Sequence, residues 1–580
     1  MAATQRLFRR EAPTGTLRAL RQADPGLQDI EYRLLAARGQ SGALLAPRDA
    51  FSARPIDLDR GAARLGAAIR TGEQIVVVAD YDCDGATSCA VMIAGLRALG
   101  AKIDYVVPDR MIHGYGISPS VVDLARDAHP DARVLVTVDN GILGHAGITH
   151  AQHLGMDVVV TDHHLPGQDL PDACAVIDPS RSDCPSGLGE LAGVGVALWL
   201  VLATRKQLAD VTGQSPNMGL LLSYLAIGTT ADLVPLRLIN RSLLDLGLRH
   251  LRAGHAPVGV KALIEECGIN PAYLTTTDIG FALAPRINAA GRLENMRQGI
   301  DLLLTQDPSE ARRLAQSLTE VNNQRKSMQK EAVAQAGVDF DALPQTDVGR
   351  FSIVQANPDW HPGIIGLVAS RLKDAHHLPT FVFSLADDKA KGSGRSIPGF
   401  HLKDALEDIA RAHPGLIAQF GGHAMAAGLT LSGIGALDPF KQAFEAVAST
   451  RVSDEMREQV LMSDGEPPDL NFDQMLRLLS HPWGQGFEPP AFDTEAKILR
   501  VDPLGKEGKH WRIQAKPAGQ KTPIGAVLFN QPAPTAGSDA HLYLRPGINT
   551  WAGNSTLQWI GEVITPEPEE QPVERERLPF

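Results

Sequence analysis

The fold of this chain is decided by residues 75–84, IVVVADYDCD, where a run of aliphatic residues ends in three aspartates spaced two apart. Nearly continuous Val- and Ile-rich runs of this kind are typical of parallel strands that are buried on both faces. Similar runs follow at 103–109, 133–140, 157–164 and 175–178. Helix-like stretches that close on Gly or Pro lie between them, at 86–100, 118–130 and 144–155. This alternation predicts a doubly wound α/β domain with a parallel sheet.

The length and the charge of the chain limit what it can be. Its 580 residues exceed what one hydrophobic core supports, so several domains are expected. Hydrophobic residues make up 44% and charged residues 21%, as in ordinary globular proteins. The formal net charge of -12 argues against a protein whose whole surface binds nucleic acid, but it leaves room for a local basic channel.

The cysteines and the apolar segments predict a cytoplasmic protein with no membrane attachment. Five cysteines, an odd number with no C-x-x-C pair, are not expected to form a disulfide framework or a structural zinc site. The N-terminal sequence MAATQRLFRREAPTG lacks the apolar stretch of a signal peptide. The most apolar segments, 191–203 and 218–229, are too short to span a bilayer.

A long helix is predicted after a helical stretch at 191–262. We expect it to run from Pro308 to Ala336, with Gly337 at its end. Its start at 307–310, DPSE, has the form of a capping box with Pro at the first helical position. The helix is polar over much of its length, which favours a solvated bridge between domains over a core helix.

Two smaller domains are predicted beyond this helix. Strand-like segments at 351–357 and 380–385 flank a helix at 363–372, which indicates a second α/β domain. Short strand-like segments from about 458 to 565 indicate an all-β barrel or sandwich. The predicted boundaries are 1–50 for an N-terminal segment, 51–305 for the first α/β domain, 306–340 for the connecting helix, 341–450 for the second α/β domain, 451–565 for the β domain and 566–580 for a disordered tail.

Acidic residues gather where the parallel strands end. Residues two apart in an extended chain point to the same side, so Asp80, Asp82 and Asp84 can converge on one spot. Further acids and a histidine pair follow at later strand ends and after another apolar run: Asp139, Asp162-His163-His164 and Asp232. In open α/β sheets ligands bind outside the carboxyl ends of the strands. We therefore expect these side chains to form one site.

Such a cluster predicts bound metal ions. Carboxylates facing one crevice repel each other unless a cation neutralises them. Oxygen ligands with one imidazole suit Mn²⁺ or Mg²⁺, whereas zinc more often binds cysteine or several histidines. Five carboxylates and one histidine are too many ligands for a single ion with open positions, so two ions are the natural number. Two metals about 4 Å apart are a device for phosphoryl transfer by in-line attack.

A simpler interpretation exists for each aspartate taken alone. An Asp at a strand end is usually a helix N-cap or a turn residue. Asp109 and Asp178, which also follow strand-like runs, are interpreted in this way. Several acids and a His-His pair at successive strand ends make that interpretation improbable for the group as a whole.

The motifs resemble those of the DHH phosphoesterase superfamily. DYDCDGATS at 80–88 is similar to its motif I, VTVDNGI at 136–142 to motif II, TDHH at 161–164 to the motif that names the family, and GTTADLVPL at 228–236 to motif IV. The likeness continues through 108–118, 284–295, 357–372, 391–399 and 420–428, and the last three segments resemble the DHHA1 domain. Residues 483–492 and the β-rich region resemble the OB-fold domain of the superfamily's single-strand-specific 5′→3′ DNA exonucleases. His113 departs from the pattern, because an acid is expected there, so it is assigned no role.

The resemblance implies the identity of the metal ligands. They would be Asp80, Asp82, Asp84, Asp139, His163 and Asp232. Asp139 would bridge the two ions. His164 would lie beside the scissile phosphate as a catalytic residue, and its alternative role is to orient a metal ligand by a hydrogen bond.

The resemblance also implies a set of substrate-binding residues. Arg offers bidentate contact to phosphate, and glycine-flanked side chains let the backbone approach a ligand closely. For any single Arg or His, a surface ion pair or a buried, hydrogen-bonded role is the alternative. Tyr115 could stack on a base. The candidates are Arg110, Tyr115, Arg286, Asn288, Arg292, His361, Ser370, Arg371, Arg395, Ser396 and His423.

Aromatic residues interleaved with basic ones in the β domain suit single-stranded nucleic acid on an OB-fold. Trp511, Trp551 and Trp559 are the candidates, and a place in the barrel core is the alternative for each.

The function implied by the resemblance is that of a two-metal-ion exonuclease. It would hydrolyse single-stranded DNA in the 5′→3′ direction to 5′-mononucleotides in DNA repair and recombination, with a single-stranded-DNA-binding protein and a helicase as partners. One alternative is a DHH phosphodiesterase acting on short oligoribonucleotides or cyclic dinucleotides, or a pyrophosphatase, but those relatives are generally shorter and lack the β-rich domain. Another is a non-catalytic DNA-binding relative like Cdc45, against which the intact acids weigh.

Overall fold

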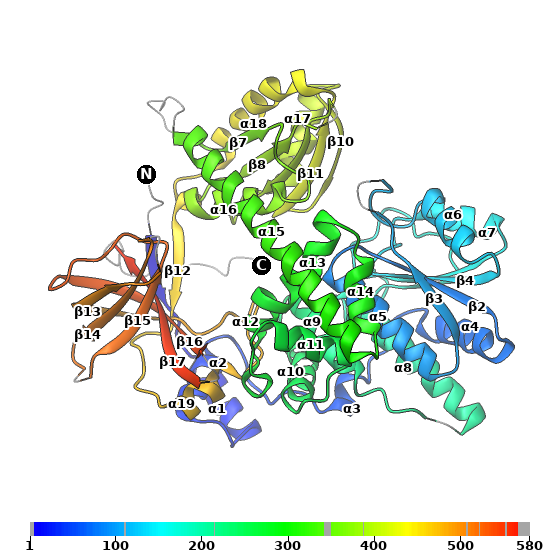
Figure 1. Ribbon diagram of the computed structural model, residues 1–580, viewed down its shortest axis with the longest axis horizontal. Helices are drawn as coiled ribbons and strands as arrows, with labels where there is room; N and C mark the ends of the chain where they lie inside the picture. The colour runs from blue at the N-terminus through cyan, green and yellow to red at the C-terminus, as the bar shows by residue number, and fades with distance from the viewer. Residues whose placement is uncertain are drawn as a thin grey trace.

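The computed structural model describes residues 5–109, 112–213, 215–341, 350–386, 388–505, 508–520, 522–551 and 554–565. Figure 1 shows two α/β domains joined by a long helix, α15, with a β-barrel to one side. The predicted fold class is confirmed. None of the described helices is long and apolar enough to cross a bilayer.

The first domain is built on a five-stranded parallel sheet with the order β3-β2-β4-β5-β6. Its strands are β2 (Gln74–Ala79), β3 (Lys102–Val106), β4 (Ala132–Val138), β5 (Asp157–Thr161) and β6 (Ala175–Ile177). Alternate residues of β2 enter two different cores, with Ile75 and Val77 on one face and Val76 and Val78 on the other. The covering helices are α4 (Leu58–Thr71), α5 (Cys83–Ala98) and α8 (Gly193–Thr212) on the first face, and α6 (Pro119–Ala128) and α7 (His145–His153) on the second.

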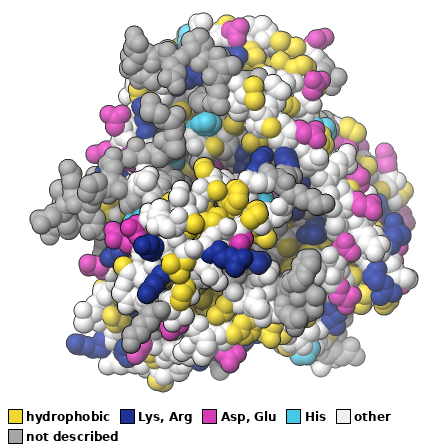
Figure 2. All heavy atoms as spheres, turned by 60° about the vertical axis from the view of Figure 1, so that its left-hand side comes forward, with side chains coloured by type: hydrophobic (Ala, Val, Ile, Leu, Met, Phe, Trp, Pro, Cys, Tyr) yellow, Lys and Arg dark blue, Asp and Glu magenta, His cyan; other side chains and the backbone are white. Residues whose placement is uncertain are grey.

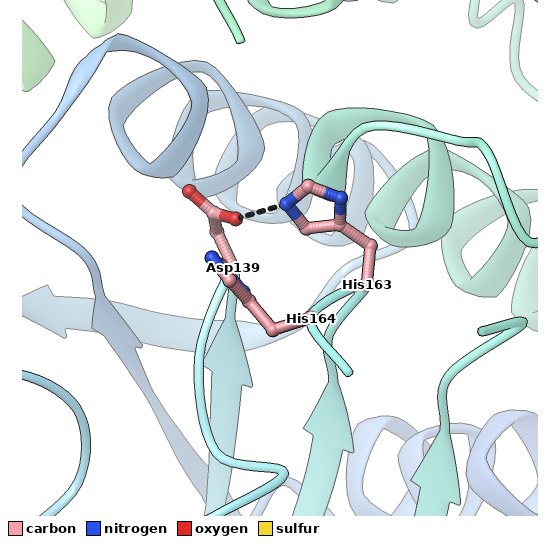
Figure 3. Close-up of side chains that lie close together, drawn as sticks. All are labelled: Asp139, His163 and His164. Carbon is pink, nitrogen blue, oxygen red and sulfur yellow. Dashed lines mark ion pairs between the residues drawn. The ribbon is translucent and has the colours of Figure 1, made fainter. Parts of the chain in front are cut away.

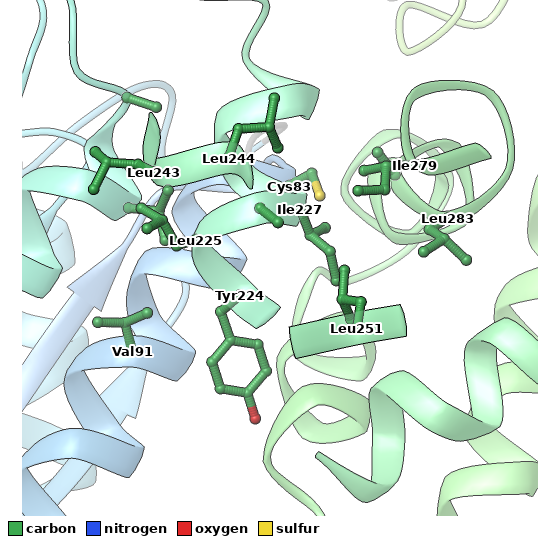
Figure 4. Packing of buried hydrophobic residues seen from close by; sticks show 14 of the residues in the cluster. Cys83, Val91, Tyr224, Leu225, Ile227, Leu243, Leu244, Leu251, Ile279 and Leu283 are labelled. Atoms are coloured by element: carbon green, nitrogen blue, oxygen red, sulfur yellow. The ribbon is translucent and has the colours of Figure 1, made fainter. Parts of the chain in front are cut away.

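A bundle of helices continues the first core (Figure 4). It comprises α9 (Leu221–Ala231), α10 (Leu238–Arg252), α11 (Val258–Glu266), α12 (Thr276–Asp278), the π-helical turn η2 (Ile279–Leu283), α13 (Ala284–Leu293) and α14 (Arg297–Leu304). Residues 226–231 of the predicted apolar run form the second half of α9, so Asp232 follows a helix, unlike the other acids. The carboxyl end of α9 nevertheless meets the carboxyl edge of the sheet.

The long helix α15 (Pro308–Asp341) links the two α/β domains. The predicted end at Gly337 is wrong, because the helix continues through this residue. A glycine costs a helix only about 1 kcal/mol relative to alanine, and the neighbouring Ala332 and Ala336 are buried in the core of the second domain. The predicted capping box is half formed: Asp307 accepts a hydrogen bond from the backbone of Ser309 (2.8 Å), whereas the side chain of Glu310 pairs with Arg313.

The second domain has a mixed sheet with the order β10-β11-β9-β8-β7, in which β7 and β8 are parallel and the other pairs antiparallel. Its elements are β7 (Ile353–Asn357), α16 (Ile365–His376), β8 (Thr380–Ser384), β9 (Lys391–Arg395), α17 (Leu402–Ala412), β10 (Ile417–Gly422), β11 (Ala426–Leu431) and α18 (Leu437–Arg451). The sequence did not indicate β9 to β11, because glycine-rich segments resemble loops.

The C-terminal region is a closed barrel with the order β13-β14-β15-β17-β16. The strands are β13 (Phe492–Pro503), β14 (His510–Pro517), β15 (Ile524–Phe529), β16 (Asp539–Trp551) and β17 (Asn554–Ile564), preceded by β12 (Gln459–Ser463) and α19 (Phe472–Leu479). The N-terminal segment packs here rather than standing alone. It contributes β1 (Gln5–Arg9), which pairs in parallel with β12, and the helices α1 (Thr14–Ala23), α2 (Asp29–Ala36) and α3 (Pro47–Ala50).

Candidate active site

Six side chains meet at the carboxyl edge of the parallel sheet. They fall into two groups, Asp80–Asp82–Asp139 and Asp84–His163–Asp232, and within each group the potential ligand atoms lie within 4.8 Å of one another. His163 Nε2 is 3.1 Å from Asp139 Oδ1 and 3.6 Å from Asp232 Oδ2, so it joins the groups. Figure 3 shows the contact between Asp139 and His163, with His164 beside it. These six are the residues for which the sequence predicts metal binding.

Helix ends hold the first acidic loop in place. Asp82 is the N-cap of α5 and accepts a hydrogen bond from the backbone of Gly85 (3.0 Å). Asp84 accepts hydrogen bonds from the backbone amides of Gly193 (2.6 Å) and Val194 (3.0 Å), and so fixes the start of α8 against the site. Gly193 must be glycine, since a Cβ there would lie 2.8 Å from Asp139 Oδ1.

Asp139 has a strained backbone. Its φ of 62° is in the left-handed region, which an aspartate adopts at a cost, and its amide donates to the carbonyl of Thr161 (3.0 Å). The neighbouring Asn140 donates from Nδ2 to the carbonyls of Val78 (3.2 Å) and Val138 (2.9 Å). These bonds tie the ends of β2 and β4 together and keep the Asp139 carboxylate turned into the site.

The cluster fits divalent cations. Asp139 Oδ1 and His163 Nε2 are buried and make no hydrogen bond, although they lie close together. Burial and the charges of neighbouring aspartates raise the pKa of the Asp84 and Asp139 carboxyls, and burial lowers the pKa of His163. A cation would remove this repulsion, and five carboxylates with one imidazole suit Mn²⁺ or Mg²⁺.

His164 is oriented by a buried aspartate, Asp162, to which the sequence assigned no role as a ligand or a catalytic residue. Asp162 Oδ1 accepts from His164 Nδ1 (2.7 Å) and from the backbone of His163 (2.8 Å), while Oδ2 accepts from the backbone of Ile142 (2.9 Å). Burial opposes protonation, but the bond to Asp162 raises the pKa of His164 to about 9. The sequence signal for this role was Asp162 of the TDHH motif, which resembles the other acids at strand ends.

A cavity of about 400 Å³ separates the two α/β domains next to this cluster. The first domain contributes Tyr81, Tyr115 and Arg292, and the second contributes the start of α16 and the glycine-rich strands, including Arg395. The hydroxyl of Tyr115 lies 3.2 Å from His164 Nε2. Three predicted substrate-binding residues, Tyr115, Arg292 and Arg395, therefore line one cavity that opens beside the acids.

Four other predicted binding residues belong to the second domain but do not line this cavity. The backbone amide of Gly363 donates to His361 Nδ1 (3.0 Å), which shapes the turn before α16. Ser370 donates to the carbonyl of Gly366 (3.1 Å), and Arg371 is exposed on the same helix. His423 is largely exposed; partial burial and then the charge of His164 lower its pKa.

Three predicted residues have structural partners. Asn288 accepts from the backbone of Cys83 (2.8 Å) and so holds the acidic loop. Arg286 donates to Thr319 Oγ1 (3.0 Å) and to the carbonyl of Ala282 (2.8 Å). Ser396 is buried and donates to the carbonyl of Phe400 (2.5 Å). Arg110 lies outside the described residues.

The acids interpreted as turn residues and the barrel tryptophans can also be placed. Asp178 is buried and accepts from the backbone of Ser180 (2.8 Å), in a turn after β6. Trp559 is buried against Phe492, and Trp511 is half-buried with its indole N–H donating to the carbonyl of Gln531 (3.0 Å). The side chain of Trp551 lies outside those described.

Three family models match the chain: the N-terminal domain of the DHH family at residues 74–229, the DHHA1 domain at 349–450 and the RecJ OB domain at 466–562. The chain is 40% identical over 561 residues to a single-stranded-DNA-specific exonuclease RecJ of Salmonella typhimurium, covering 93% of this chain and 96% of that protein. To the Escherichia coli RecJ it is 39% identical over 564 residues, with the same two coverages, 93% and 96%. Its structure is similar to that of Thermus thermophilus RecJ in complex with Mn²⁺, with a TM-score of 0.79 and 28% identity over 98% of this chain and 80% of that chain.

An acidic sheet edge faced by a second α/β domain defines a DHH phosphoesterase, as the motifs indicated. The likeness extends beyond both catalytic domains into the barrel and spans nearly the whole length of the relatives. The chain belongs to the RecJ family.

Proposed function

We propose that this protein is a metal-dependent exonuclease that hydrolyses single-stranded DNA from the 5′ end to 5′-mononucleotides. The observation that carries the proposal is the acid cluster, which fits divalent ions and opens into a cavity lined by Arg292 and Arg395. Relatives 40% and 39% identical are named single-stranded-DNA-specific exonucleases, and solved RecJ structures hold Mn²⁺ or Mg²⁺.

The side chains of the site would have different roles in the reaction. Divalent ions held by the six ligands would supply an activated water and neutralise charge on the phosphate. His164, fixed through Nδ1 by Asp162, is placed to donate a hydrogen bond to a phosphate oxygen. Arg292 and Arg395 would hold phosphates from opposite walls of the cavity. Tyr115, at the cavity wall, would stack on a base and fix its register.

The polarity of the reaction depends on recognition of a strand terminus. Ser370 and Arg371, on the helix α16 whose start lines the cavity, are candidates to bind a terminal 5′-phosphate. Arg110, which lies outside the described residues, is a third candidate from the sequence of the first domain. A terminal phosphate held there would place the next phosphodiester at the metals. A cleft between two rigid domains favours a single strand over a duplex, which is wider.

The barrel and the surface charge support a long substrate. Lys497 and Lys516 are exposed and directly opposite each other on β13 and β14, with Asp539 opposite Lys497 on β16. A bound polyanion would relieve the repulsion between the two lysines. Basic and hydrophobic side chains mix toward the middle of the face shown in Figure 2, although the whole chain is acidic. This supports single-stranded DNA rather than a cyclic dinucleotide or pyrophosphate as the substrate. The complete ligand set, in turn, disfavours a non-catalytic role.

We also infer the setting in which the enzyme works. Its five cysteines are all free, which suits a reducing cytoplasm. An exonuclease with this substrate needs a helicase to expose single strands and meets single-stranded-DNA-binding protein on them. We therefore propose both as partners, and DNA repair and recombination as the processes served.

The test is a comparison of substrates with and without metal. We expect the purified protein with Mn²⁺ to degrade single-stranded DNA, to spare a blunt duplex and RNA of the same sequence, and to be inactive in excess chelator. Equal degradation of the duplex would contradict the proposed specificity, and activity in chelator would contradict the metal centre.

A further inference from the structure

An aromatic side chain is exposed beside the metal-binding acids. Phe281 is 80% exposed, on the π-helical turn η2, while Ile279 and Leu283 of the same turn are fully buried. The π-helical turn has one more residue than an α-helical turn, and such turns often occur at functional sites. The local backbone therefore presents a large apolar ring to solvent, although buried positions are available on the same turn.

A second apolar side chain is exposed at the neighbouring helix end. Leu233 directly follows the metal-ligand candidate Asp232, is 67% exposed and has a φ of 60°. The left-handed conformation is strained for a leucine, so the chain maintains strain to turn this side chain outward. Val234 and Leu236, further along, are buried. A single exposed apolar residue needs no explanation, but a strained one at the end of a helix that packs against the turn of an exposed phenylalanine does.

Both residues belong to elements near Asp232, since η2 packs against α9, whereas Arg292 lines the cavity at the other end of α13. At η2, a Cβ on Gly280 would be 3.8 Å from Thr230, two residues before Asp232. From there α13 runs past the acidic loop, where Asn288 contacts Cys83, to Arg292 at the cavity wall. Eleven residues of helix correspond to about 16 Å. A strand that enters at Phe281 and ends in the cavity would cross the metal site on its way.

Positive charge accompanies this path. Arg286 donates to the carbonyl of Ala282, the residue after Phe281. Arg286 also donates to Thr319 Oγ1 of α15 (3.0 Å), and α15 carries Arg325 and Lys326 further along. Phosphates of a single strand could therefore follow the basic side chains while its bases face the apolar ones, which is how single strands are usually bound.

We propose that Phe281 and Leu233 form a stacking shelf for bases on the 3′ side of the scissile phosphate. The shelf holds the strand that remains to be degraded in register while its terminal nucleotide occupies the cavity. This inference rests on the proposed function, and it makes Phe281 a positioning residue rather than a catalytic one. At the stacked rise of about 3.4 Å per nucleotide, 16 Å corresponds to at most about five nucleotides.

The test uses strands in which one base is missing. Single-turnover cleavage by the full-length protein is measured on 5′-phosphorylated strands with one abasic site at each position from the second to the sixth nucleotide. Wild-type protein should lose roughly ten- to a hundredfold in kcat/KM at one or two adjacent positions. Phe281→Ala should lose a similar factor on the intact strand and should no longer respond to an abasic site at those positions. Phe281→Tyr should restore the response.

A matched control is available on the same domain. Val211 is 68% exposed near the far end of α8, about 27 Å along that helix from Gly193, and Val211→Ala should leave the whole profile unchanged. On trinucleotides, which are too short to reach the shelf, the penalty of Phe281→Ala should be much smaller than on long strands.

Three results are distinguishable. If wild-type protein cleaves intact strands but no abasic position matters, the shelf is refuted and the proposed function stands. If Phe281→Ala slows trinucleotides as much as long strands, or stays sensitive at the same positions, Phe281 has a structural role and the shelf is again refuted. If wild-type protein cleaves no strand, the proposed function itself fails.

Discussion

At the scale of single residues, Asp139 combines several features that are each unfavourable for an aspartate. It is buried, it has a left-handed backbone, and its Oδ1 faces His163 at 3.1 Å. The structure maintains this arrangement through Asn140 and through the glycine at 193. Strain and desolvation in one residue are typical of a group that acts on a ligand.

Replacement of Asp139 should separate activity from stability. Asp139→Asn removes a charge that two metal sites would share, so hydrolysis should fall by at least about a hundredfold at saturating Mn²⁺. The metal-free variant should be more thermostable than the metal-free wild type, because repulsion from Asp84, Asp82 and Asp80 is relieved. Turnover and melting in chelator measure the two effects. Near-normal turnover would remove Asp139 from the centre.

Asp162 should affect turnover mainly through His164. Asp162→Asn weakens the bond that orients the imidazole, and we expect a loss of about 10–100-fold in turnover while Mn²⁺ affinity changes much less. Asp157→Asn, at the opposite end of the same strand, is the matched control and should have little effect. If Asp162→Asn instead abolished Mn²⁺ binding, the aspartate would act mainly on His163.

The residues of the site were predictable to different extents. Asp80, Asp139 and His163 could be brought together from sequence, because parallel strands end at the same edge of a sheet. The hydrogen-bond partners of His164 and Asn288 could not be predicted from the sequence. The first depends on the conformation of a turn, and the second joins residues 205 positions apart.

At the scale of elements, the glycine-rich strands of the second domain show why the sequence did not predict them as strands. Gly392 and Gly394 on β9 lie over the rings of Phe383 and Phe381, where a Cβ would come within 2.5 Å of ring atoms. The phenylalanines supply the apolar volume that a strand normally carries on its own side chains. Sequence patterns count apolar residues along one segment, so they miss a strand whose packing is provided by its neighbour.

This packing can be tested within one sheet. Gly394→Ala should destabilise the protein by about 1–3 kcal/mol, because the methyl group overlaps Phe381. Gly428→Ala on the adjacent β11 is the control, since the nearest atom to its Cβ would be 3.9 Å away. Denaturant unfolding measures both. Equal stability of the two variants would show that the sheet adjusts without strain.

At the scale of the whole molecule, the N-terminal segment contacts both the first domain and the region before the barrel, since Gln40 also accepts a hydrogen bond from Arg241 of α10 (2.7 Å). Arg38 and Asp464 form an ion pair at 2.8 Å with both side chains 2% exposed, and β1 pairs with β12. Glu31 accepts from Arg477 (2.8 Å) and His481 (2.7 Å). The sequence indicated only a segment before residue 51, because no local pattern reveals a strand whose partner is more than 450 residues away.

The contribution of Glu31 to stability should depend on pH in a defined direction. Burial opposes the ionisation of Glu31, but hydrogen bonds from His481, Arg477 and the backbone of Gln28 lower its pKa to about 2. A carboxyl whose folded pKa lies below its unfolded value of about 4.3 stabilises the fold above that value and loses this contribution as the pH falls toward 2. Glu31→Gln should therefore lower the free energy of unfolding by about 3 kcal/mol at pH 7. The difference in this free energy between wild type and variant should narrow below about pH 4. A difference that stayed constant down to about pH 3 would contradict this account.

We infer that a divalent-metal centre in this protein degrades single-stranded DNA from its 5′ end. The order in which end labels are released tests this inference most directly. One 5′-phosphorylated strand is labelled at either end and followed over time with Mn²⁺. We predict that the 5′ label appears as a mononucleotide at the earliest times, while the 3′ label stays in a ladder of shortening fragments. Release of the 3′ label as a mononucleotide first, or internal fragments before any terminal release, would contradict the account.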